Sequence, residues 1–151
     1  MAESATFEPR RRARRRALQA LYQWRINRRD MGEIVREFLQ EQDFSNVDRD
    51  LFESLCRGIS ASADELDKRL GDFVDRPLRR LDVIERVILH IGAWELLKHR
   101  EDPTPVILDE CVDLAHRFGA EQGHAFVNAI LDRAAQQWRP DEASPAGAMD
   151  E

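Results

Sequence analysis

A dense run of arginines followed by an aromatic residue is the feature of this sequence best suited to binding. Residues 10–24 read RRRARRRALQALYQW, and nine arginines fall between residues 10 and 29 without a single acid among them. Guanidinium groups form bidentate hydrogen bonds with phosphates, and an aromatic ring beside them can stack on an unpaired base. This combination indicates a surface for a single-stranded polyanion.

Helical geometry divides this segment into two faces. We predict a helix from about residue 9 to 27, with Arg11 and Arg15 within about 20° of Tyr22 around its axis, and Arg29 as well if the helix extends that far. A stripe roughly 100° wide lies on the other side, and it consists of Ala13, Ala17, Ala20, Leu21 and Trp24. The alternative is that the arginines only solvate an exposed helix, with Tyr22 half-buried beside Leu18.

The rest of the chain is acidic. The 151 residues carry 23 basic and 29 acidic side chains, a formal net charge of −6. Without the nine arginines, 14 basic residues face 29 acids, a balance of −15. The positive charge is therefore local, and the acidic remainder is suited to a basic protein partner.

The residues that could support catalysis or bind a metal form no recognisable pattern. The four histidines lack ligand spacing, and the sequence contains no phosphate-binding loop or nucleophile elbow. Cys56 and Cys111 lie far apart and are interpreted as small core residues, and His90 as a core or edge residue. We therefore predict a protein that is not an enzyme and that uses no metal or cofactor.

The sequence also argues against a targeting segment or a membrane span. Gln19, Gln23 and Arg25 interrupt the apolar stretch that a signal peptide would need after its charges. No window approaches about 18 consecutive apolar residues. We expect a soluble cytoplasmic protein that does not contact membranes.

Apolar residues recur at intervals of three and four along most of the chain, which predicts an all-α fold. Helices are expected to begin after Asp30, Asp48 and Asp82, whose side chains can cap them. Another helix is expected at Thr104, with Thr104 as the N-cap and Gly119 as the C′ residue, and a last one from about residue 122 to 138.

Composition suggests three regions. Residues 1–9 are expected to be a flexible N-terminus, residues 10–139 a single helical domain, and residues 140–151 a disordered acidic tail. The domain is predicted to hold two helical sub-bundles.

Four segments together resemble the bacterial NusB family of transcription antitermination factors. They are the arginine segment, FLQEQD, VIERVILHIGAWELLK and FGAEQGHAFVNAILDRAA, and the similarity spans roughly residues 10–140. The resemblance implies about seven helices in two three-helix sub-bundles. It also implies binding of single-stranded boxA leader RNA from ribosomal RNA operons, together with the small-subunit ribosomal protein NusE. The complex would join RNA polymerase and other Nus factors to suppress premature termination.

The resemblance assigns two RNA-binding patches. The candidates are Arg10, Arg11, Arg12, Arg14, Tyr22, Gln122, Phe126 and Asn128. Phe126 is expected to stack on a base, although the spacing of its neighbours also fits a core stripe, and Phe118 is expected in the core. Gln122 stands where some relatives carry an acid.

The resemblance also places the ribosomal partner on Phe73, Arg76, Asp82 and Glu85. Asp72 and Asp75 add negative charge there, which suits a basic protein. Asp82 and Glu85 equally fit the first turn of a helix, where acids are favoured.

Two other classes of function share features with this sequence. NusB-like domains also precede the catalytic domain of certain ribosomal RNA methyltransferases, but the chain ends at Glu151. A protein-interaction module, such as a homodimer that covers the arginine face, remains an alternative.

Overall fold

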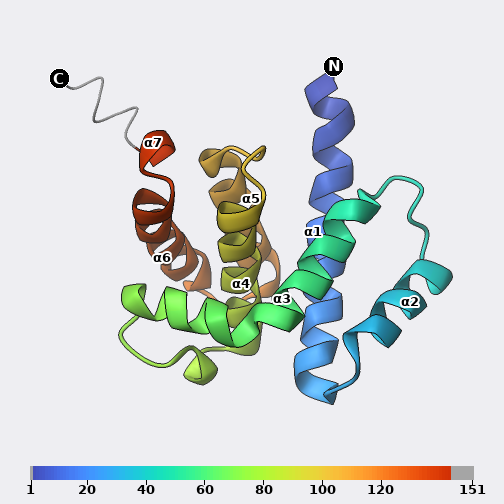
Figure 1. The fold of residues 1–151 in the computed structure, drawn as a ribbon, viewed down its shortest axis with the longest axis horizontal. Coiled ribbons are helices and arrows are strands. Elements are labelled where there is room, and N and C mark those ends of the chain that lie inside the picture. The colour runs from blue at the N-terminus through green and yellow to red at the C-terminus, as the bar shows by residue number, and fades with distance from the viewer. Residues whose placement is uncertain (1, 144–151) are drawn as a thin grey trace. The chain divides into compact units, whose positions relative to one another are not determined.

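The structure is a computed structural model, which describes residues 2–143 and the side chains of residues 7–142. The described residues form seven α-helices and two short 3₁₀ helices, with no strand among them (Figure 1). Their bounds are α1 Ala2–Asn27, α2 Met31–Glu41, α3 Arg49–Leu70, η1 Gly71–Phe73, η2 Leu78–Arg80, α4 Val83–Lys98, α5 Thr104–Phe118, α6 Gly123–Trp138 and α7 Pro140–Ala143. The predicted all-α class and two helical sub-bundles are confirmed.

The chain divides into two compact units at residue 63. The boundary lies within α3, beside a kink at Ser62, where the backbone departs from helical geometry. Unit 1 contains α1, α2 and the first part of α3, and unit 2 contains the remainder.

In unit 1, α1 and α2 pack together. The three alanines of the predicted stripe have no exposed surface, Leu21 is 1% exposed, and Trp24 is half-buried. The predicted core face of α1 is thus confirmed, with Trp24 at its edge.

The structure starts α1 at Ala2, earlier than the predicted start near Pro9, which lies inside the helix. Side-chain contacts between neighbouring turns stabilise this first part of the helix. The guanidinium of Arg11 lies 4.9 Å from the centroid of the Phe7 ring and 3.6 Å from the carboxylate of Glu8.

The three predicted aspartate caps are confirmed. The carboxylate of Asp30 accepts the backbone N–H of Glu33, that of Asp48 accepts Leu51, and that of Asp82 accepts Glu85. Each cap satisfies one of the N–H groups that a helix start leaves unpaired.

In unit 2, α4, α5 and α6 pack against one another pairwise. The central helix α4 is buried through most of its length, as its apolar sequence predicts. Cys56 in unit 1 and Cys111 in unit 2 are buried free thiols, which confirms their interpretation as core residues.

A buried arginine closes one end of unit 2. Arg139 follows α6 and has no exposed surface. Its guanidinium donates to the carbonyls of Glu95, Leu96 and His99, which end α4, at 2.8–3.0 Å. It also donates to the carbonyl of Asp102 at 2.6 Å. The carbonyls of Glu95 and His99 also accept the backbone N–H groups of His99 and Asp102, so the guanidinium adds to the hydrogen bonds that close the end of this helix.

The same guanidinium fixes the start of α5 and the turn α7. It donates to the carboxylate of Glu142 at 2.7 Å and to the hydroxyl of Thr104 at 3.4 Å. The Thr104 hydroxyl donates to Glu142 at 2.9 Å, so it takes part in this network and does not cap the helix. The N-cap of α5 is Pro103, and not Thr104 as predicted.

The disordered tail was expected from residue 140, but residues 140–143 are helical. Residues 144–151 lie outside the described residues.

Gly119 is the C-cap of α5, whereas the sequence predicted it as the C′ residue. Its backbone is extended, at φ −90°, and not left-handed. A side chain there would place Cβ 2.7 Å from the carbonyl oxygen of Ala115, so close approach requires the glycine. The left-handed conformation occurs instead at Gln122, with φ 78°.

A second polar cluster joins the last part of α3 to α4. Asp67 accepts from Nη2 of Arg86 at 2.5 Å and lies 2.6 Å from Nε2 of His90, which is 1% exposed. The core interpretation of His90 is confirmed. Burial raises the pKa of Asp67, but hydrogen bonds from His90 and Arg86 outweigh burial and hold that pKa below its ordinary value.

None of the described helices combines the length and the apolar character needed to cross a bilayer.

Replacing Arg139 by lysine should destabilise the protein by about 3 kcal/mol, because one ammonium cannot satisfy carbonyls on several sides. Chemical denaturation measures the change. Arg100→Lys is the matched control, since Arg100 is exposed in the same unit. Equal stability of the two variants would contradict the structural role of Arg139.

Acid should weaken the contact made by Asp67. A carboxyl group with a lowered pKa stabilises the folded state above its ordinary pKa and loses that contribution as the pH falls through its folded pKa. Asp67→Asn should therefore be less stable than the parent at neutral pH, and the difference should shrink on acidification. Asp64→Asn, an exposed position on the same helix, should show neither effect in denaturation curves across this range.

Candidate nucleic-acid interface

The α1 face predicted to bind RNA is partly exposed. Tyr22 is 39% exposed, Arg12 is exposed, and Arg10 and Arg11 are half-buried. Ile26, one turn after Tyr22, is 51% exposed. The aromatic ring therefore lies at the surface, on the side of the helix away from its buried alanines.

Acidic and carbonyl groups from elsewhere in unit 1 reach the arginines. Arg10 forms an ion pair with Asp48 at 3.1 Å, and Arg12 donates to the carbonyl of Asn46 at 3.3 Å. Arg16 donates to the carbonyl of Asp43 at 3.1 Å. The loop between α2 and α3 thus orients these side chains. Residues 10–29 contain no acid, so the sequence of the arginine segment alone did not predict these contacts.

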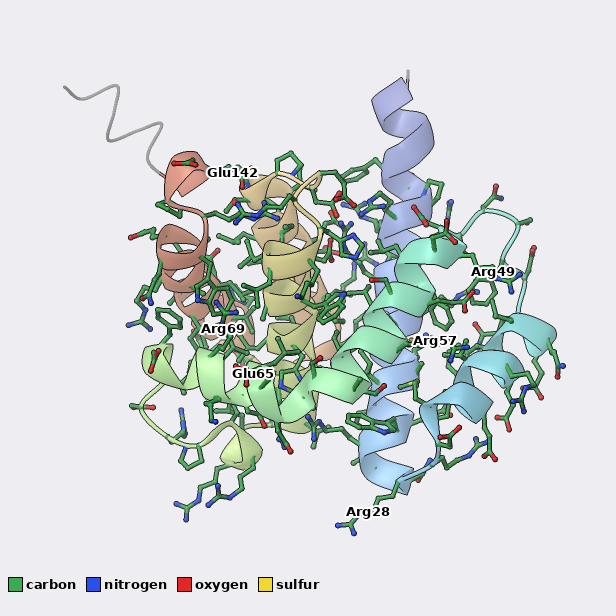
Figure 2. All side chains as sticks on the ribbon, viewed as in Figure 1. Arg28, Arg49, Arg57, Glu65, Arg69 and Glu142 are labelled. Atoms are coloured by element: carbon green, nitrogen blue, oxygen red, sulfur yellow. The ribbon has the colours of Figure 1, made fainter. Side chains whose placement is uncertain are left out.

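Two further acids engage arginines of this segment. Glu8 lies near both Arg11 and Arg12, and Glu37 holds Arg29 through two hydrogen bonds. Arg28 is exposed, and its side chain extends away from the end of α1 (Figure 2). The arginine face is therefore positive but partly neutralised.

Arg14 differs from the other candidates because it is buried, with 2% of its surface exposed. A phosphate could reach its guanidinium only after the surroundings of Arg14 rearrange. Arg10, Arg11 and Arg12 are the more accessible members of the motif.

The second predicted RNA patch lies at the start of α6 in unit 2. Gln122 and Asn128 are exposed, and Phe126 is half-buried. Val127, Ile130 and Leu131 are buried, so the core stripe of α6 runs beside Phe126. The aromatic ring lies at the edge of the core.

The structure brings a predicted partner-binding residue onto this patch. The guanidinium of Arg76 lies 5.7 Å from the centroid of the Phe126 ring and pairs with Asp75 at 3.5 Å. Phe73 points elsewhere: its ring meets that of Trp138 edge-on at 5.8 Å, and its carbonyl accepts from Arg133 at 3.2 Å.

Glu85 also reaches α6. Its carboxylate lies against Gly123, where a side chain would overlap it. Burial raises the pKa of Glu85 and the Asp82 carboxylate raises it further, against a backbone hydrogen bond from Ala120 and the charge of Arg76. Asp82 caps α4, so the capping interpretation of Asp82 is confirmed.

Phe118 was expected in the core, and this expectation is wrong. It is 46% exposed at the last position of α5, where the helix ends and the chain turns away. Apolar type and helical spacing both favoured burial, and no local signal marked the exposed position. Phe118 adds an aromatic surface to the loop that precedes α6.

One group of side chains has the types that bind metals, although the sequence predicted no such site. Ligand atoms of His99, Glu101 and Asp102 lie within 4.8 Å of one another. The guanidinium of Arg139 bonds the carbonyls of His99 and Asp102 at 2.9 and 2.6 Å. A fixed positive charge so close opposes a cation, so we assign no metal to this group.

Known proteins resemble the chain over nearly its whole length. The model of the NusB family matches residues 11–136. A transcription antitermination protein NusB from Hahella chejuensis is 44% identical over 143 residues, covering 95% of this chain and 96% of that protein. Another, from Nitrosococcus oceani, is 47% identical over 131 residues, covering 87% and 88%. A solved structure of T. maritima NusB superposes with a TM-score of 0.77 at 31% identity and covers 95% of this chain and 98% of that one.

The fold and these matches define a non-catalytic regulatory protein that acts in transcription antitermination. The chain belongs to the NusB family.

Substituting Gly123 tests the packing of Glu85. In Gly123→Ala the new methyl group should push the carboxylate toward water, so the pKa of Glu85 should fall toward its ordinary value. Gly71→Ala is the control, because a side chain there meets nothing within 4 Å. An NMR titration of the Glu85 carboxyl carbon measures the shift, and an unchanged pKa in Gly123→Ala would refute the contact.

Proposed function

We propose that the chain is an RNA-binding adaptor for boxA-type leader RNA of ribosomal RNA operons. It acts with the ribosomal protein NusE and joins RNA polymerase and other Nus factors to suppress premature termination. The observation that carries the proposal is the exposure of Tyr22 among arginines on a helix whose other face is buried. Guanidinium groups contact phosphates, and the tyrosine stacks on an unpaired base.

The start of α6 supplies the second contact. Phe126 offers a ring at the edge of the core, and Gln122 and Asn128 offer exposed amides that can hydrogen-bond to base edges. Phe118 joins this set because of its exposure. These residues would select bases, while Arg10, Arg11 and Arg12 hold the backbone, and Arg14 supports them from beneath.

The partner surface is proposed on Phe73, Arg76, Asp82 and Glu85. Asp72, Asp75 and Asp82 are exposed and suit a basic ribosomal protein. The family membership supports this proposal. All of the proposed binding residues lie between Arg10 and Asn128, within the helical domain predicted at residues 10–139.

Titration of a labelled boxA-type RNA, with and without NusE, tests the function. We expect tighter binding than to a scrambled RNA of equal length, and a log-log salt slope of about −2 from the phosphate contacts of Arg10, Arg11 and Arg12. Equal affinity for both RNAs under both conditions would refute the proposal.

Tyr22 is the residue to test first. Tyr22→Ala should weaken binding of the boxA-type RNA by about 1–3 kcal/mol, the usual value of one stacked base. Tyr22→Phe keeps the ring and should bind almost as the parent does. Circular dichroism should show unchanged helicity in both, because Tyr22 is 39% exposed. Equal affinity of the alanine and phenylalanine variants would exclude stacking.

A homodimer that covers the arginine face is a second candidate, favoured by the exposure of Tyr22 and Ile26 one turn apart. Sedimentation with and without RNA separates the two. A dimer that RNA does not dissociate, and that has no affinity for RNA, would favour the interaction module.

A further inference from the structure

A short arginine-rich segment of unit 2 begins at Arg76 and contains two further arginines that the surfaces described above do not include. Residues 76–80 read RPLRR and contain three arginines and no acid. Arg79 and Arg80 are exposed. Within the part of the chain that the structure describes, neither guanidinium has a hydrogen-bond or ion-pair partner. The two therefore present positive charge that no neighbouring side chain uses.

The backbone that carries this pair is fixed. Leu78 and Leu81 are 3% and 8% exposed, and η2 packs against α4. The N–H groups of Arg80 and Leu81 close two consecutive turns at 3.0 Å, onto the carbonyls of Pro77 and Leu78. Ligand binding would therefore order only the two side chains and not the backbone.

Arg76 links this pair to the start of α6. Its guanidinium covers the Phe126 ring at 5.7 Å. From residue 76 to residue 80 an extended chain spans at most about 14 Å, so Arg79 and Arg80 lie within that reach of Arg76. Arg79 and Arg80 therefore belong to the same short segment as the arginine that covers Phe126.

Within the described residues, the acids around this segment do not pair with Arg79 or Arg80. Asp75 pairs with Arg76, and Asp82 caps α4. The carboxylate of Glu85 lies against Gly123. Free guanidinium groups beside an aromatic ring are the arrangement that binds single-stranded nucleic acid, with phosphates on the arginines and a base on the ring.

We propose that Arg79 and Arg80 contact phosphates of the same RNA whose base stacks on Phe126. This inference rests on the proposed function and extends the RNA footprint from the start of α6 onto η2. The contact of Arg76, three and four residues earlier in the same segment, with Phe126 favours RNA over an acidic protein as the ligand of this pair.

The test is the double variant Arg79→Gln/Arg80→Gln, titrated with the labelled boxA-type RNA at several salt concentrations. Loss of two phosphate contacts should reduce the magnitude of the log-log salt slope by about 1.4 and weaken binding several-fold at low salt. Circular dichroism should be unchanged, because Leu78 and Leu81 remain. The matched control Lys68→Gln/Arg100→Gln removes two charges from exposed positions of the same unit and should leave the slope nearly unchanged.

Three results would overturn the inference. One is an unchanged slope in the η2 variant, and another is an equal change in the control, which would mean that only total charge matters. The third is a loss of affinity that appears only when NusE is present, which would assign the pair to a protein contact. Failure of the parent protein to prefer boxA-type RNA would instead refute the proposed function itself.

Discussion

The buried alanine face of α1 is the constraint on which the candidate interface depends. Ala13, Ala17 and Ala20 have no exposed surface, and their small side chains allow close approach of neighbouring elements. Once that face is buried, helical geometry determines where every other side chain of α1 lies. Tyr22 reaches the surface for this reason.

The loop between α2 and α3 holds several arginine side chains of α1 in place. Asp43, Asn46 and Asp48 bind arginines that would otherwise sample many rotamers. This order lowers the entropy lost when a ligand binds, and the acids reduce the net attraction to indiscriminate polyanions. Local charge balance therefore favours selectivity over maximal affinity.

Unit 2 depends on contacts at both ends of α6. Arg139 joins its end to the end of α4, and Gly123 lets Glu85 approach its start. The position of Phe126 follows from this anchoring, because the ring lies between the buried stripe of α6 and the guanidinium of Arg76. The contacts that anchor α6 therefore also position the candidate RNA-binding residue Phe126.

Local signals in the sequence predicted the helices, the core stripe of α1 and the caps at Asp30, Asp48 and Asp82, because each depends on residues within one or two turns. Interactions between distant residues were not predictable. Arg10 meets Asp48 across 38 positions, and Arg139 meets Leu96 across 43. The exposure of Phe118 and the burial of Arg14 likewise depend on tertiary packing, which residue type alone does not reveal. Arg76 and Phe126 were assigned to different partners, and only the structure showed their contact.

Photo-crosslinking with a boxA-type RNA that carries 4-thiouridine, followed by mass spectrometry of the linked peptides, tests the central claim most directly. The account predicts crosslinks on the α1 peptide that contains Tyr22 and on the α6 peptide that contains Phe126, and their loss when unlabelled boxA-type RNA competes. Crosslinks confined to α2 or to the exposed face of α3, with both of these peptides unmodified, would contradict it.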